Sequence, residues 1–253
     1  MAAGQAERAS SVDAEEVARF DALAQDWWRL DGPMAALHRL NPVRVAHARD
    51  LLLRHFGPRA GVSPARPLEG LRLLDAGCGA GLFAEPLARL GASVCAVDPA
   101  PANIAAAKVH AEASGLSIDY RCSSVEALAE AGESFDAVFM MEVLEHVRDV
   151  AGFVSAAGAL ARPGGLVVAA TLNRTAKSYV LAVVGAEYVL GWAPRGTHDW
   201  RKFVTPRELE RAFARAGLTA FDETGVIFDP LAGSWRLGRD LAVNYMTAAR
   251  KEG

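Results

Sequence analysis

The sequence of 253 residues lacks the features that mark several large classes of protein. Its three cysteines, Cys78, Cys95 and Cys122, are odd in number and lack metal-ligand spacing, so we expect reduced thiols rather than a disulfide framework or a zinc module. No uninterrupted apolar run reaches the roughly 18 residues of a membrane span, and no signal peptide is visible. A net charge of −3 gives no general attraction to nucleic acid, which we do not expect as a partner. The best interpretation is a cytoplasmic enzyme.

One stretch that is rich in glycine organises the rest of the chain. Residues 71–83 read L-R-L-L-D-A-G-C-G-A-G-L-F, an apolar run of strand character that ends at Asp75. Gly77, Gly79 and Gly81 follow at alternate positions, and then a helical pattern begins. Glycine permits positive φ and lets another molecule approach the backbone where a Cβ would block it. A strand, such a loop and a helix N-terminus together form a nucleotide-cofactor site at the carboxyl edge of a parallel sheet.

A second acidic residue supports a nucleotide cofactor. The next predicted strand, residues 92–97, leads into Asp98, 21 positions after Gly77, where a carboxylate can accept hydrogen bonds from ribose hydroxyls. The dinucleotide fingerprint G-x-G-x-x-G would need a glycine where Leu82 stands. The pattern G-x-G-x-G, preceded by Asp75, instead resembles motif I of the class I S-adenosylmethionine methyltransferases. For the glycines alone, a tight turn between strand and helix is the alternative explanation.

Beyond this unit, strands and helices alternate along the chain. Further strands are expected at residues 118–122, 135–141, 166–171, 221–228 and 241–248, and further helices at 101–114, 149–161 and 205–216. This order predicts the α/β fold class, with a doubly wound, mostly parallel sheet, N-terminal helices, and a helical insert before the late strands. We expect one domain over residues 13–253 after a disordered end at residues 1–12.

Local signals predict where the N-terminal helices begin and end. Asp13 is expected to cap a first helix, with Glu16 as its capping-box partner. Asn41-Pro42 predicts a turn, after which a second helix runs over residues 43–56.

Several separated stretches agree with one family. They are W-W-R-L-D-G-P-M-A-A-L-H-R-L-N-P-V-R at 27–44, M-E-V-L-E-H-V at 141–147, T-L-N-R-T-A-K-S-Y at 171–179, V-V-G-A-E-Y at 183–188, P-R-G-T-H-D-W-R-K-F at 194–203 and V-N-Y-M at 243–246. Together they closely resemble the ubiquinone-biosynthesis O-methyltransferases, which methylate polyprenylated catechols. The resemblance covers about residues 17–248. It implies S-adenosylmethionine as the cofactor.

The resemblance also implies which residues bind the methyl donor. Arg44, Gly77, Asp98 and Met141 match the positions that contact it. Arg44 is always charged and suits the methionine carboxylate, although a surface ion pair is an alternative use for it. Gly77 allows close backbone approach, Asp98 suits the ribose, and Met141 offers a soft apolar wall to the adenine.

A third group of residues concerns the chemistry. Glu142, Glu145 and His146 match a set thought to hold a divalent ion in eukaryotic members, and their i, i+3, i+4 spacing is compatible with one face of a helical turn. Two carboxylates and an imidazole suit a cation such as Mg²⁺, which would chelate a catechol and lower its pKa. We expect His146 and Glu145 to be the catalytic residues. Two alternatives stay open: metal-free catalysis with His146 as general base, and a purely structural role.

The insert at residues 173–203 is not needed to build the sheet. Its middle, 14 residues from Tyr179 to Trp192, is apolar apart from Glu187 and too short to span a bilayer. Basic residues flank it: Arg174, Lys177, Arg195, Arg201 and Lys202. Such a segment suits the surface of an anionic membrane. We therefore expect peripheral association with the inner membrane, where a polyprenyl tail resides. A lid helix docked on the core is the alternative.

The resulting hypothesis is an enzyme that methylates 2-polyprenyl-6-hydroxyphenol, 3-demethylubiquinol or both, with other ubiquinone-biosynthesis proteins as further partners. Two alternatives remain at this point. The first is a soluble methyltransferase of small phenols, in which the insert serves only as a lid. The second is a membrane-associated scaffold that binds the cofactor without turnover.

Overall fold

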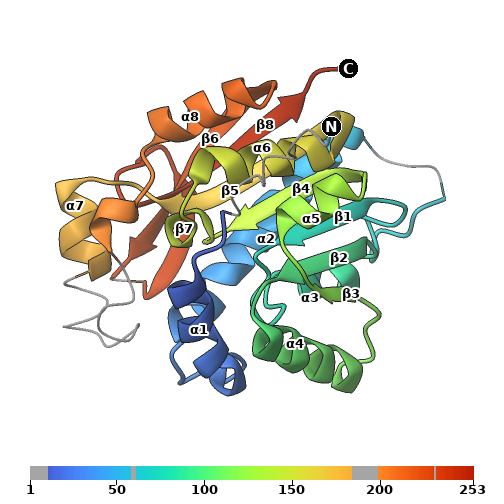
Figure 1. The fold of residues 1–253 in the computed structure, drawn as a ribbon, viewed down its shortest axis with the longest axis horizontal. Coiled ribbons are helices and arrows are strands. Elements are labelled where there is room, and N and C mark those ends of the chain that lie inside the picture. The colour runs from blue at the N-terminus through green and yellow to red at the C-terminus, as the bar shows by residue number, and fades with distance from the viewer. Residues whose placement is uncertain (1–10, 58–60, 184–198, 231) are drawn as a thin grey trace, which may run out of the picture.

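The computed structural model describes residues 11–57, 61–183, 199–230 and 232–253, and shows one eight-stranded sheet covered by helices (Figure 1). The strand order is β3-β2-β1-β4-β5-β8-β6-β7. The strands are β1 (Arg72–Ala76), β2 (Ser93–Asp98), β3 (Asp119–Cys122), β4 (Phe135–Met141), β5 (Ala161–Leu172), β6 (Leu218–Asp229), β7 (Ser234–Gly238) and β8 (Asn244–Lys251). Strands β1 to β5 pair in parallel, whereas β8 runs antiparallel to β5 and β6. The predicted fold class, a doubly wound and mostly parallel sheet, is confirmed.

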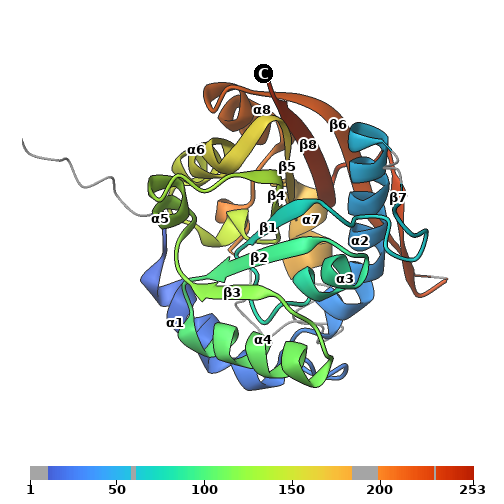
Figure 2. The same cartoon turned by 90° about the vertical axis from the view of Figure 1, so that its right-hand side faces the viewer.

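Helices cover both faces of this sheet (Figure 2). Apolar side chains of α2 (Ala35–Phe56), α3 (Ala84–Arg89) and α4 (Pro101–Ala113) pack on one face. Those of α5 (Val125–Glu130), α6 (Val150–Leu160) and α8 (Pro206–Arg215) pack on the other. The short helices α1 (Ala14–Ala22) and α7 (Ala176–Ser178) belong to neither layer. None of the helices in the described ranges is both long enough and apolar enough to cross a membrane.

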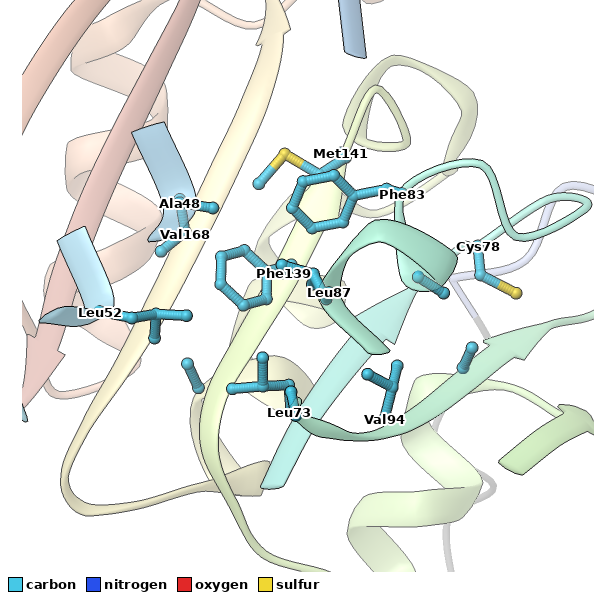
Figure 3. Packing of buried hydrophobic residues seen from close by; sticks show 14 of the residues in the cluster. Ala48, Leu52, Leu73, Cys78, Phe83, Leu87, Val94, Phe139, Met141 and Val168 are labelled. Atoms are coloured by element: carbon cyan, nitrogen blue, oxygen red, sulfur yellow. The ribbon is translucent and has the colours of Figure 1, made fainter. Parts of the chain in front are cut away.

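The core beneath the glycine loop consists of close-packed apolar side chains. The rings of Phe83 and Phe139 lie 5.3 Å apart between their centroids, and Figure 3 shows them in one cluster with Leu87 and Met141. Leu73 and the whole of β4 are buried, because strands in the middle of a doubly wound sheet are covered on both faces. This rigid layer supports the loop that follows β1.

Two sequence predictions about the N-terminal helices are wrong. Helix α2 runs without a break from Ala35 through Pro42, where we predicted a turn. The reason is tertiary: Asn41 is buried, and its Nδ2 donates to the carbonyl oxygen of Leu82 at 2.7 Å, which favours the helical path through Pro42. Asp13 does cap α1, accepting from the Glu15 backbone N–H, but Glu16 is not its capping-box partner.

The chain is already ordered two residues before Asp13. Ser11 is buried and donates its backbone N–H to Glu126 Oε1 at 3.1 Å, although we predicted disorder as far as residue 12. Residues 1–10 lie outside the described residues, as do residues 184–198 of the predicted insert.

Candidate functional site

A cavity of about 210 Å³ lies at the carboxyl ends of β1, β2 and β4. The glycine loop and the residues that follow these strands form its floor. Helix α1 and the segment after it, up to Leu37, form the opposite wall, and Figure 2 shows α1 close to the tip of β2. Every predicted site residue lines this cavity: Arg44, Gly77, Asp98, Met141, Glu142, Glu145 and His146.

The glycine loop brings bare backbone to the cavity. Gly77 has a φ of 77°, and a Cβ added there would lie 2.4 Å from Val143 Cγ2. The backbone N–H groups of Gly77 and Cys78 donate to the Val97 carbonyl oxygen at 2.8 and 3.0 Å, which ties the loop to the end of β2. Only glycine fits here, because both the backbone angle and the space exclude a side chain.

Asp98 ends β2 and is buried at the cavity. Its Oδ2 accepts from the Gly79 N–H at 2.9 Å, and its Oδ1 accepts from the Ala100 N–H at 2.9 Å and from Asn103 Nδ2 at 3.3 Å. Burial raises the pKa of Asp98, although these donors oppose the effect. The carboxylate therefore fixes the glycine loop as well as facing the cavity.

Arg44 and Asp75 lie in the same buried region, and each keeps an unused polar atom. Arg44 Nη2 donates to Asn41 Oδ1 at 3.1 Å, and Nη1 lies 3.8 Å from Glu142 Oε1, while Nε has no partner. Asp75 Oδ2 also has none. Burial raises the pKa of Asp75 to about 7, with Arg44 opposing this and Asp98 adding to it. Asp75 is not among the donor-binding residues that the family resemblance implies, although its place two residues before Gly77 is a signal.

Met141 is the last residue of β4 and supplies an apolar wall. Its side chain is buried in the cluster with Phe83 and Phe139, and it also lines the cavity (Figure 3). A thioether at this position is polarisable and suits the face of an aromatic ring.

Glu142 and Glu145 follow β4 and interact with each other. Glu142 has a φ of 54°, the one positive value at a non-glycine position in the described ranges. Burial and the neighbouring Glu145 carboxylate raise the pKa of Glu142, whereas Arg44 lowers it. Glu145 is buried, and its Oε2 accepts from Thr171 Oγ1 at 2.7 Å.

His146 ends a 3-10 turn over Leu144–His146. Its Nδ1 lies 3.2 Å from Glu16 Oε2 on α1. Glu142 precedes this turn in the left-handed region, so the three residues do not share one face of a helical turn as we expected. In the part of the chain that the structure describes, no three His, Cys, Asp or Glu side chains gather in a way that could hold a metal ion. The metal set therefore stays a prediction, and we assign no reaction step to a metal.

Comparison with known proteins identifies the family. A model of the methyltransferase domain matches residues 45–223. A ubiquinone biosynthesis O-methyltransferase of Methylocella silvestris is 69% identical over 246 residues, which cover 96% of each chain. The chain belongs to the ubiquinone biosynthesis O-methyltransferase family. Another member, from Methylobacterium nodulans, is 57% identical over 243 residues, 95% of this chain and 96% of its own.

Solved structures agree with this fold. Magnesium protoporphyrin IX methyltransferase from Synechocystis with bound S-adenosylhomocysteine gives a TM-score of 0.63 at 18% identity, over 93% of this chain and 97% of that one. A S-adenosylmethionine-dependent methyltransferase from Thermotoga maritima gives 0.64 at 18% identity, over 94% and 100%. This ubiquinone biosynthesis O-methyltransferase family member therefore has the class I methyltransferase fold and is an S-adenosylmethionine-dependent enzyme.

The cavity fits that cofactor. Five residues that line it each have a buried polar atom without a partner among the described residues: Arg44 Nε, Asp75 Oδ2, Asn103 Oδ1, Glu126 Oε2 and Trp27 Nε1. Buried polar atoms are normally hydrogen-bonded, so unpartnered donors and acceptors around one cavity indicate a polar ligand. A molecule with a carboxylate, an ammonium group, a ribose and an adenine can satisfy atoms of both kinds.

Proposed function

We propose that this enzyme methylates a catechol-type hydroxyl of a polyprenylated ubiquinone precursor. The observation that carries the proposal is that one cavity joins the residues suited to the cofactor with His146, a side chain able to take a proton. The names of the relatives support the substrate class.

Four residues hold the methyl donor in this account. The buried guanidinium of Arg44 binds the methionine carboxylate, and the Asp75 carboxylate accepts from the ammonium group. Asp98 accepts from the ribose hydroxyls, and Met141 lies against the adenine. When bound, S-adenosylmethionine supplies a methyl group on a positively charged sulfur. Acidic residues outnumber the two arginines at the cavity, Arg19 and Arg44, and therefore favour a cation there. The acidic residues are Asp13, Glu16, Asp75, Asp98, Glu126, Glu142 and Glu145.

The reaction needs a more nucleophilic substrate than a neutral phenol. A phenol with a pKa near 10 is only about a thousandth ionised at pH 7, roughly 4 kcal/mol short of its nucleophilic form. His146 takes this proton as general base, a role that typically contributes about a hundred- to ten-thousand-fold. Helix α1, which forms one wall of the cavity, excludes water and holds the two reactants together. Holding them together removes much of the entropic cost of their encounter. Glu145, fixed by Thr171, shapes the site beside the base.

The substrate class also requires access to a tail that stays in lipid. Tyr179, Val180 and Leu181 at the start of the insert expose 48%, 56% and 51% of their surface, although all three are apolar or aromatic. A second cavity, of about 420 Å³, lies among six basic residues and one acidic residue, Glu208. The six are Arg148, Arg174, Arg201, Lys202, Arg211 and Arg215. Exposed apolar groups beside a basic surface favour the anionic face of a bilayer.

A turnover assay tests the proposal. Purified enzyme receives the methyl donor with either a prenylated catechol or a tail-less catechol, in chelator and then with a series of divalent ions. We expect methylation of both catechols, with higher kcat/KM for the prenylated one on vesicles. Activity that survives chelator leaves His146 as the base, whereas loss of activity that an ion restores returns Glu142, Glu145 and His146 to the predicted metal set. Binding of the donor without transfer to either catechol would refute the enzyme and favour a scaffold.

A further inference from the structure

Helix α1 holds the imidazole of His146 at two points. Glu16 Oε2 lies 3.2 Å from Nδ1, across 130 residues of sequence, and both side chains are largely buried. Phe20, one helical turn after Glu16, meets the ring edge to face, with centroids 5.0 Å apart and an angle of 85° between the planes. Residues four apart lie on one helix face, so both contacts come from the same side of α1.

The carboxylate of Glu16 is kept in its ionised form. Lys202 Nζ lies 3.2 Å from Oε1, and Arg19 Nη2 lies 2.6 Å from Oε2. Two cationic groups this close favour the charged form of a carboxyl group. An ionised carboxylate can only accept hydrogen bonds.

This arrangement determines which ring nitrogen carries the proton. Because Glu16 Oε2 accepts, the hydrogen between the two residues belongs to Nδ1 of His146. A neutral imidazole with its hydrogen on Nδ1 has its free lone pair on Nε2. A fixed lone pair is what a general base needs, and a partner on the other nitrogen is the usual device that fixes it.

We propose that Glu16 is a positioning residue for His146, which it holds in the Nδ1–H tautomer with Nε2 free to accept the substrate proton. The inference rests on the proposed function, in which His146 is the base. The catechol O–H bond breaks and its proton goes to Nε2. The oxygen electron pair forms the new bond to the methyl carbon while the carbon–sulfur bond breaks, and Glu16 keeps its charge opposite the imidazolium.

The orienting carboxylate lies on α1 rather than on the sheet that carries His146. The base is therefore correctly oriented only while α1 is docked over the cavity. A simpler role for Glu16 would be docking alone, and α1 has other contacts for that purpose, since Asp13 lies 3.4 Å from both Arg148 and Lys202. The experiment must separate orientation of the base from attachment of the helix.

A double-mutant cycle makes this separation. The variants are Glu16→Gln, His146→Asn and the pair, with Glu15→Gln as a matched control, because Glu15 is exposed on the same helix. We expect Glu16→Gln to lower kcat by roughly ten- to hundred-fold, part of what a base contributes. The dissociation constant of S-adenosylmethionine, measured by calorimetry, should stay within about twofold because Glu16 has no cofactor role. In the His146→Asn background, Glu16→Gln should not lower kcat any further, because the effects of residues that act as one unit are not additive.

Three other outcomes are distinguishable. If Glu16→Gln leaves kcat unchanged, or lowers it by the same factor with and without His146, Glu16 does not act through the base and the inference is wrong. If His146→Asn is fully active, the assignment of the base fails and the inference with it. If wild type transfers no methyl group, the proposed function itself is refuted.

A spectroscopic readout on the wild-type protein avoids any dependence on activity or on how a variant folds. Long-range ¹H–¹⁵N NMR spectra distinguish the two tautomers of a neutral histidine ring, and the signals of His146 are assigned by their loss in His146→Asn. We expect the Nδ1–H pattern in wild type and in Glu15→Gln, and a mixed or Nε2–H pattern in Glu16→Gln. An Nε2–H pattern in wild type, or an unchanged pattern in Glu16→Gln, would overturn the inference.

Discussion

The indole ring of Trp27 lies against the α-carbon of Gly79, so closely that a Cβ on Gly79 would come 2.2 Å from the ring. Trp27 belongs to the N-terminal segment that covers the cavity, and Gly79 belongs to the loop that forms its floor. The neighbouring Trp28 donates its Nε1–H to the Ala80 carbonyl oxygen at 3.1 Å. The two halves of the site therefore meet at the glycine loop, without a side chain between them.

Gly79→Ala should disturb this contact. Gly79 and Gly115 both have positive φ, 53° and 65°, but a Cβ on Gly115 would meet nothing within 4 Å. Each substitution should cost about 1–2 kcal/mol of folding stability for the left-handed backbone. Only Gly79→Ala should also raise the dissociation constant of S-adenosylmethionine, by about tenfold or more, because the indole must move. Equal affinities of the two variants in calorimetry would show that the contact does not matter for binding.

Asp98→Asn should strongly weaken the binding of the cofactor. Hydrogen bonds to a charged group contribute about 1.5–3 kcal/mol each, so the loss of one or two raises the dissociation constant roughly tenfold to beyond a hundredfold. We choose asparagine because Asp98 also accepts from Gly79 and Ala100. Asparagine keeps one acceptor oxygen for one of these buried donors, whereas alanine would leave both without a partner. Asp119→Asn, at a carboxylate that pairs with Arg121, is the control. Unchanged affinity in folded Asp98→Asn would refute the ribose assignment.

Asp75 should make the cofactor-free protein less stable at alkaline pH. Its pKa is about 7 in the folded protein and 3.8 in the unfolded reference, so the folded state prefers the protonated form. The stability it contributes is fully present below pH 3.8 and is lost as pH rises to about 7, by roughly 4 kcal/mol. The free energy of unfolding of Asp75→Asn minus that of wild type should therefore be larger at pH 8 than at pH 4.5. Denaturant unfolding without cofactor measures the free energy of unfolding of the variant and of wild type at each pH. The same difference between the two proteins at pH 4.5 and at pH 8 would contradict the prediction.

Local patterns were sufficient to predict the strand–loop–helix unit and most of the sheet. The apolar run before Asp75, the alternating glycines and the acidic end of β2 are all continuous in sequence, so their roles need no tertiary information. The edge strand β7 was missed, because Ser234–Gly238 is short and mostly exposed and pairs with β6 at the edge of the sheet.

The errors concern residues whose partners lie far away in sequence. Glu16 has the spacing of a capping-box residue, but its carboxylate lies beside His146, 130 positions later. Asn41-Pro42 has the composition of a turn, but the contact between Asn41 and Leu82 holds the residue within α2. Periodicity cannot report such pairs, because the fold brings them together only after the sheet has formed.

The exposed apolar start of the insert should bind lipid. Burial of apolar surface is favourable by roughly 25 cal/mol per Å², and each nearby basic residue adds about 1 kcal/mol at an anionic surface. Val180→Asp should therefore reduce flotation with anionic vesicles and lower kcat/KM for a long-tailed catechol more than for a tail-less one. Val109→Asp, at an exposed valine on α4, is the matched control. An equal loss of kcat/KM for both substrates would indicate that the segment is a lid. Failure of the wild-type protein to bind vesicles would refute the membrane proposal.

The most direct test of the whole account is the fate of a labelled methyl group. Wild-type enzyme, S-adenosylmethionine with a ¹³C-labelled methyl group and a short-chain prenylated catechol are incubated together, and the product is analysed by mass spectrometry and NMR. We predict one labelled methyl ether on a catechol oxygen, formed at a rate that falls at least tenfold in His146→Asn. A labelled carbon on the ring or on no product, in an enzyme that binds the donor in calorimetry, would contradict O-methyl transfer at this site.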